Sequence, residues 1–174
     1  MLDGDPGLGK STLLIDIAAR VTTHGMHFNG KQGPTGHVIL LSAEDGPEDT
    51  IKPRLEAAGA NPRMIHELTH ISVGTHERPV EIPIDLDHIE AVIAEHNAKL
   101  VIIEPLAAFL CGPDANKDQE IRHVIYKLSK LAEKYNCAII VMRRLNKSGG
   151  GKAIYRGNMS IGVIGPASIG LLLY

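Results

Sequence analysis

Residues 4–11 read Gly4-Asp5-Pro6-Gly7-Leu8-Gly9-Lys10-Ser11, which fits the pattern G-x-x-x-x-G-K-[ST]. Glycines in such a stretch let the backbone turn tightly and direct several N–H groups toward one anion. The lysine and the hydroxyl that end the pattern suit phosphate oxygens and a Mg²⁺ ion, respectively. The stretch therefore predicts a phosphate-binding loop, in which Lys10 reaches the β- and γ-phosphates and Ser11 ligates Mg²⁺.

The residues that follow the loop predict a helix that ends near Gly25. Apolar side chains recur there at helical spacing: Leu13, Leu14, Ile17, Ala18 and Val21. A helix that starts at the loop points its positive dipole end at the same anion, which favours phosphate binding over an ordinary glycine-rich turn. The expected nucleotide-binding residues are Gly4, Asp5, Pro6, Gly7, Leu8, Gly9, Lys10, Ser11 and Thr12.

Composition restricts the class of protein. The chain has 174 residues, of which 44% are hydrophobic, and a formal net charge of −2. These values predict one globular domain without the overall basic charge of many nucleic-acid-binding proteins. Cys111 and Cys137 form no C-x-x-C pair, which indicates reduced thiols in a cytoplasmic protein. No apolar run approaches the roughly 18 residues of a membrane span, so no membrane partner is expected.

Strand and helix patterns alternate along the chain. Buried strands are predicted at 37–42, 68–73, 100–103, 138–142 and 169–174. Further helices are predicted at 46–58, 85–97 (capped by Asp85) and 118–135, and a loop at 77–83. Such alternation is typical of an α/β fold in which helices cover both faces of a mostly parallel sheet.

Three polar residues follow these buried strands: Glu44, Glu104 and Arg144. The carboxyl ends of parallel strands meet at one edge of the sheet, where ligands bind. Glu104 follows four apolar residues, the layout of an acid that organises Mg²⁺, and Glu44 is the candidate base that orients an attacking water. For either acid the alternative is a solvated loop carboxylate.

The segment 143–156 contains no acid and five basic residues: Arg143, Arg144, Lys147, Lys152 and Arg156. It fits contact with a bound γ-phosphate, in the same subunit or across a subunit boundary, or contact with a nucleic-acid backbone. A solvated basic loop is the third interpretation.

The chain resembles the ATPase core of RecA-like proteins, of the AAA type near plasmid RepA and DnaB replicative helicases. The matching stretches follow the family's order over nearly the whole chain: GDPGLGKST, HVILLSAEDGPEDTIKPRL, KLVIIEPLAAFL, CAIIVMRRLNKSGGGKAIYRGNMSIG and GLLLY. The resemblance implies a three-layer RecA-like P-loop NTPase domain over residues 1–174, with ATP and Mg²⁺ as cofactors. It also implies a ring-shaped homo-oligomer that contacts single-stranded DNA through the basic segment 143–156.

By the same resemblance, the catalytic residues are Lys10, Glu44, Glu104 and Arg144, and the metal residues are Ser11 and Glu104. Glu104 replaces the family's usual aspartate, and Arg144 replaces the usual His or Gln that senses the γ-phosphate. Because only Met1, Leu2 and Asp3 precede the loop, the domain is expected to lack the strand normally found there. The predicted function is ATP hydrolysis in a motor of the DNA replication helicase type. The alternative is a nucleotide-binding regulatory module, or a degenerate motor, with little hydrolysis.

One further pattern, His66-Glu67-Leu68-Thr69-His70, matches the zinc-protease motif H-E-x-x-H. That motif requires a helix, whereas these residues run into a predicted strand, which would separate His66 and His70 too far for one Zn²⁺ ion. The remaining histidines show no ligand spacing, so the sequence predicts no zinc site.

Overall fold

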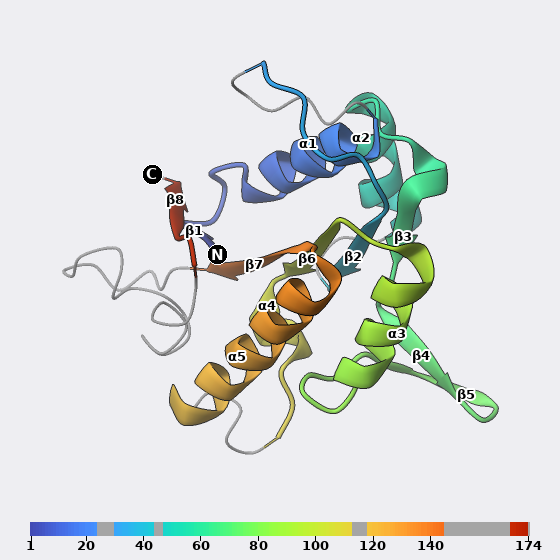
Figure 1. The fold of residues 1–174 in the computed structure, drawn as a ribbon, viewed down its shortest axis with the longest axis vertical. Helices are drawn as coiled ribbons and strands as arrows, with labels where there is room; N and C mark the ends of the chain where they lie inside the picture. Colours follow the sequence, from blue (N-terminus) through green and yellow to red (C-terminus); the bar gives the residue numbers. More distant parts are fainter. Residues whose placement is uncertain (24–29, 44–46, 113–117, 145–167, 174) are drawn as a thin grey trace.

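The computed structural model describes residues 1–23, 30–43, 47–112, 118–144 and 168–173. Its centre is a six-stranded sheet in which every pair of neighbouring strands is parallel (Figure 1). Across the sheet the strands are β3 (Ile65–Glu67), β2 (Val38–Ser42), β6 (Leu100–Glu104), β7 (Ala138–Arg144), β1 (Leu2–Gly4) and β8 (Leu171–Leu173). The predicted parallel α/β sheet is confirmed.

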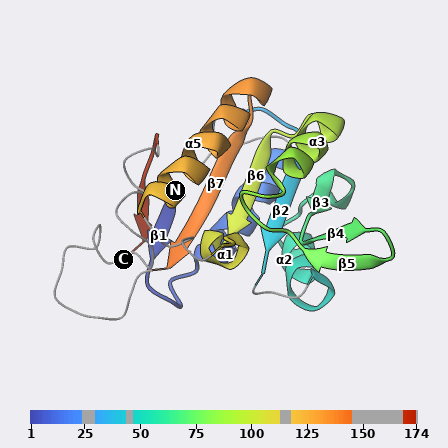
Figure 2. The same cartoon turned by 90° about the horizontal axis from the view of Figure 1, so that it is seen from below.

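Helices cover both faces of this sheet, as Figure 2 shows. One face carries α1 (Lys10–Thr22) and α2 (Lys52–Ala57), and the other carries α3 (Leu86–His96) and α5 (Asp118–Tyr135). Shorter pieces are α4 (Leu106–Phe109), a π-helical turn at Pro47–Ile51 and a 3-10 turn at Pro62–Met64. Alternate residues of β2 enter the two cores: Val38 and Leu40 pack with α1 and α2, while Ile39 and Leu41 pack with α3 and α5. The run of apolar residues in β2 is therefore continuous because helices cover both faces of the sheet.

A strand precedes the phosphate loop, so the prediction that it is absent is wrong. Leu2–Gly4 forms β1, a strand of three residues that are all buried. Leu2 pairs with Met142 of β7 on one side and with Leu171 of β8 on the other. Pairing on both sides satisfies the backbone of a strand that is too short to produce a recognisable pattern.

The strand predicted at 68–73 begins at residue 70 and does not belong to the main sheet. β3 ends at Glu67 in the main sheet, and β4 (His70–Val73) pairs antiparallel with β5 (His76–Pro79). The prediction of a loop at 77–83 is therefore wrong over its first residues. Gly74, whose φ is +63°, permits the tight turn between β4 and β5.

Asp85 precedes α3, but its side chain makes no capping hydrogen bond to the helix. It instead accepts two hydrogen bonds from the Arg78 guanidinium, each 2.7 Å long, and one of 2.7 Å from the backbone N–H of Glu81. Asp85 therefore does not cap the helix but joins β5 to the start of α3. The bond from Arg78, followed by that from Glu81, holds the pKa of Asp85 below its usual range.

We expect Asp85→Asn to lower the Tm by about 3 °C at pH 7, because the amide loses the charge-assisted bonds to Arg78. A carboxyl whose pKa is depressed by folding stabilises the protein above its unfolded pKa and loses that effect as the pH falls through the folded value. The difference between the two proteins should therefore shrink below about pH 4. Thermal melts from pH 3 to 8 measure it, with Asp87→Asn, an exposed acid in the same turn, as the control. Equal changes in Tm for both variants would contradict a specific role for the ion pair between Asp85 and Arg78.

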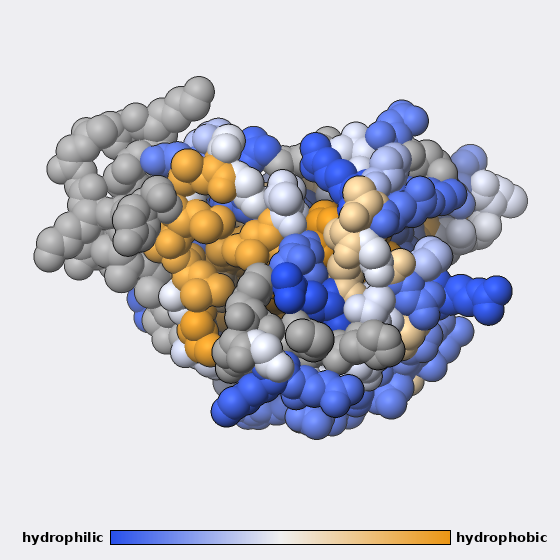
Figure 3. Space-filling view, turned by 90° about the horizontal axis from the view of Figure 1, so that it is seen from above, coloured by the Kyte–Doolittle hydropathy of each residue, from blue (hydrophilic) through white to orange (hydrophobic). Residues whose placement is uncertain are grey.

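An apolar area marks the edge of the sheet at β8. Ile169, Leu171 and Leu172 there are exposed by 68%, 53% and 43%. Figure 3 shows apolar side chains gathered on the left of the view, the side on which β8 lies in Figure 1. Within the described parts of the chain, no helix has both the length and the apolar character needed to cross a membrane.

Candidate functional site

The carboxyl ends of four neighbouring strands form one edge of the sheet. Ser42 of β2 lies in register with Glu104 of β6, and Gly4 of β1 lies in register with Arg144 of β7. The register of the sheet thus brings the start of the phosphate loop, the acid that ends β6 and the arginine that ends β7 to the same edge. This arrangement is the one that alternating strands and helices predict.

The loop between β1 and α1 has the backbone that its glycines allow. Gly7 and Gly9 have φ values of +85° and +78°, which side chains with a Cβ rarely adopt. Gly4 is needed for a different reason: a Cβ there would lie 3.0 Å from the carbonyl oxygen of Leu173 and 3.4 Å from the Lys10 side chain. Residues 6–9 are exposed, so the loop faces solvent at the edge of the sheet.

Lys10 is the first residue of α1, and its side chain turns back over the loop. Its ammonium donates hydrogen bonds to the carbonyl oxygens of Gly4 (2.9 Å) and Asp5 (2.7 Å). Only 6% of Lys10 is exposed. The loop therefore holds a positive charge at its centre, close to the N-terminal end of α1, where an anion is stabilised.

Ser11 and Glu104 meet although they are 93 positions apart in the sequence. The Ser11 hydroxyl donates a hydrogen bond of 2.5 Å to Oε1 of Glu104. The longer glutamate side chain thus reaches the hydroxyl directly from the end of β6. Glu104 is 8% exposed, and a small cavity beside the pair is lined by Ser42 and Arg54.

This pair fits a Mg²⁺ ion by its chemistry. Mg²⁺ prefers oxygen ligands, usually one or two protein oxygens together with water and phosphate oxygens. A hydroxyl and a carboxylate in direct contact at the end of the loop provide such oxygens in one place. The two predicted metal residues are therefore brought together.

The two arginines that end β7 have different surroundings. Arg144 is exposed at the edge of the sheet, as expected for a residue that meets a ligand. Arg143 is 1% exposed and donates to the Asp3 carboxylate through Nε (3.0 Å) and Nη2 (2.6 Å). The predicted contact of the basic segment with phosphate is wrong for Arg143, because this side chain is buried in an ion pair that joins β7 to β1.

Other predicted residues lie outside the described part of the chain. These are Glu44, which comes just after β2, and the basic residues Lys147, Lys152 and Arg156. Thr12 is exposed in the first turn of α1, next to Ser11. The roles of all these residues stay predictions.

The geometry of this edge is that of a P-loop protein, and comparison with known proteins assigns the family. A model of the AAA domain family matches residues 1–150. The chain belongs to this family. The AAA domain is also similar to the DNA repair protein RadA of Bacillus subtilis (strain 168), with 23% identity over 152 residues. These residues are 86% of the chain but 28% of RadA, so the chain spans little more than a quarter of that relative. The RecA-like resemblance is confirmed, while the placement of this AAA domain near RepA and DnaB stays a prediction.

Proposed function

We propose that this chain binds ATP with Mg²⁺ and hydrolyses it as the motor domain of a DNA-acting protein. The contact of 2.5 Å between Ser11 and Glu104 carries the proposal. Nucleotide hydrolysis requires a hydroxyl that ligates the metal and an acid that organises the water around it, at the end of a phosphate loop. Family membership and the likeness to RadA support the same activity.

Each residue at the edge has a role in this proposal. Lys10 exchanges the carbonyls of the loop for the β- and γ-phosphate oxygens, whose charge it stabilises. Ser11 would supply an oxygen ligand for Mg²⁺, and Glu104 would orient the water around the ion. Glu44 orients the attacking water, and Arg144 donates to the γ-phosphate and so senses its presence. Mg²⁺, when bound, neutralises part of the phosphate charge.

The proposed partners are single-stranded DNA and further copies of the chain. RadA is a DNA repair protein, and the likeness to it supports a DNA partner. The basic residues from Arg144 to Arg156 would contact the phosphate backbone in a salt-dependent way. The exposed apolar area at β8 supports contact with another protein surface, as a ring of subunits requires.

Phosphate release from Mg²⁺-ATP, measured at several protein concentrations with and without single-stranded DNA, tests the proposal. We expect turnover that DNA increases and that rises more steeply than the protein concentration, since neighbouring subunits complete the site. Nucleotide binding without turnover would favour the alternative, a regulatory module. Absence of both binding and turnover would overturn the proposal.

We expect Glu104→Gln to lower kcat about 10–100-fold while nucleotide binding is retained, because the amide orients metal-bound water poorly. Glu104→Asp keeps the charge and should retain most of the turnover. Steady-state phosphate release and equilibrium nucleotide binding measure the two effects separately. The matched control is Glu120→Gln, an exposed acid on α5. If Glu104→Gln were as active as Glu120→Gln, Glu104 would have no role in the reaction.

A further inference from the structure

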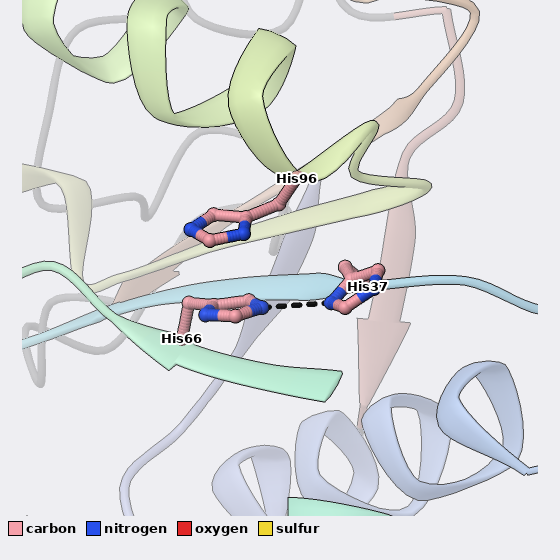
Figure 4. Close-up of side chains that lie close together, drawn as sticks. All are labelled: His37, His66 and His96. Carbon is pink, nitrogen blue, oxygen red and sulfur yellow. Dashed lines mark hydrogen bonds between the residues drawn. The ribbon is translucent and has the colours of Figure 1, made fainter. Parts of the chain in front are cut away.

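Three histidines gather at the edge of the sheet opposite to the phosphate loop (Figure 4). His37 directly precedes β2, His66 lies in β3, and His96 is the last residue of α3, which leads into β6. These positions are at the amino ends of β2 and β6. The nucleotide site lies at the carboxyl ends of the strands, so the histidine cluster is separate from it.

The three imidazole rings are in direct contact. The rings of His66 and His96 stack with their centroids 3.6 Å apart, and those of His37 and His66 lie 5.0 Å apart. Nδ1 of His37 and Nε2 of His66 share a hydrogen bond of 2.7 Å. One nitrogen from each histidine lies within 4.8 Å of the other two. All three residues are half-buried, so solvent reaches the cluster.

Regular backbone structure holds each histidine in place. The carbonyl of His37 accepts a hydrogen bond of 2.8 Å from the N–H of Lys99. His66 lies opposite Ile39 in the parallel pairing of β3 with β2. His96 ends a helix whose next N–H, that of Asn97, bonds back to Ala94. The ligand atoms can therefore adjust by side-chain rotation while the backbone stays fixed.

We propose that His37, His66 and His96 form a binding site for a late first-row transition metal ion, of which Zn²⁺ is the simplest probe. Imidazole nitrogens suit Zn²⁺, Cu²⁺ and Ni²⁺, whereas Mg²⁺ and Ca²⁺ require oxygen. Zn–N bonds of about 2.0–2.1 Å place tetrahedral ligand nitrogens roughly 3.3 Å apart. The ligand nitrogens now lie within 4.8 Å of one another, and the rings of His66 and His96 are stacked. Metal binding therefore requires these rings to rotate about their side-chain bonds, so that the lone pair in each ring plane points at the ion. The fourth position is left to water.

The surroundings of His66 agree with this assignment. Burial, and then the neighbouring His96 and His37, lower the pKa of its imidazole, against a smaller opposing effect of Glu95. Neutral imidazole is the form that ligates a metal.

The site uses other residues than the local sequence pattern suggests. H-E-x-x-H would pair His66 with His70, but His70 lies in β4 and is exposed, outside the cluster. Spacing along the sequence does not reveal this group, because three separate elements bring His37, His66 and His96 together. A bound metal would fasten the starts of β2 and β6 to β3 without touching the nucleotide edge.

Titration of the full chain, prepared without a histidine tag, with Zn²⁺ and Co²⁺ tests the site. We expect one ion per chain, a visible Co²⁺ spectrum typical of tetrahedral nitrogen ligation, and a Tm rise of about 5–10 °C at a hundredfold excess over Kd. His37→Gln, His66→Gln and His96→Gln should each weaken binding at least about 100-fold, whereas the control His70→Gln should leave it unchanged. Equal losses for His70→Gln and His96→Gln, or no saturable binding of either ion, would overturn the proposal.

A second measurement needs no variant and so does not depend on whether a variant folds. Chemical modification of histidines in the wild-type chain, read by mass spectrometry, should be suppressed by Zn²⁺ at His37, His66 and His96. Modification of the exposed His70, His76 and His88 should not change. Protection that is absent, or equal at all six residues, would contradict the site. Because nucleotide binding occurs at the opposite edge, a failure of ATP hydrolysis would leave this result unaffected.

Discussion

Lys10→Ala is expected to reduce ATP hydrolysis by about 1,000-fold and to weaken nucleotide binding as well. Groups that neutralise the phosphates in the transition state have effects of this order. In the described part of the chain, Lys10 is the ammonium that lies within the loop, 2.9 Å from the Gly4 carbonyl and 2.7 Å from that of Asp5. Alanine removes the charge from the point where the γ-phosphate would lie.

The measurements are phosphate release under saturating Mg²⁺-ATP and equilibrium binding of a fluorescent ATP analogue. Lys10→Arg tests geometry, since its planar guanidinium keeps the charge but cannot follow the path of the ammonium; we expect it to bind nucleotide and to turn over poorly. Lys130→Ala removes the same charge from an exposed position on α5 and serves as the control. A Lys10→Ala protein that hydrolyses ATP at the rate of Lys130→Ala would exclude the loop as the catalytic site.

Much of this nucleotide edge is predictable from sequence because each part depends on local chemistry. The glycines, Lys10 and Ser11 occupy fixed positions in one loop, and the apolar run before Glu104 marks a strand that is buried on both faces. Parallel pairing then determines that the ends of β1, β2, β6 and β7 meet at one edge. Periodicity and strand polarity are together sufficient for these features.

Other features escape the sequence because they depend on pairings between distant segments. Asp3 and Arg143 are 140 positions apart, and neither the three-residue β1 nor its register with β7 has a local signal. His37 and His66 likewise meet only through the pairing of β2 with β3. The β4–β5 hairpin has one local signal, Gly74 at its turn, but β5 reads His-Glu-Arg-Pro and has no β-branched or aromatic residue that would mark it as a strand.

The buried ion pair between Asp3 and Arg143 has the largest expected effect on stability. Their side chains are 9% and 1% exposed, and their shortest contact is 2.6 Å. Removing one partner leaves a buried charge without compensation, which costs about 3–5 kcal/mol. Since a domain of this kind has a free energy of unfolding of about 5–15 kcal/mol, Arg143→Met should remove a large part of it.

The double variant Asp3→Leu/Arg143→Met should recover most of that loss. Replacing both charges by apolar groups removes the cost of burying them as well as their attraction. Urea unfolding of the wild type, the two single variants and the double variant gives the coupling energy between the residues. Arg122→Met is the control, because Arg122 pairs with Asp118 at 2.9 Å on the exposed face of α5 and should cost about 0.5 kcal/mol or less.

The same pair also connects stability to the nucleotide edge. Asp3 immediately precedes Gly4, and Arg143 immediately precedes Arg144, so the ion pair fixes the register in which these two edge residues face each other. The double variant, even where it regains stability, lacks the charged contact that selects this register. We therefore expect it to bind nucleotide more weakly than the wild type at equal stability. A double variant with wild-type nucleotide affinity would show that backbone pairing alone sets the register. If Arg143→Met lowered the free energy of unfolding as little as Arg122→Met does, the ion pair would contribute nothing to folding.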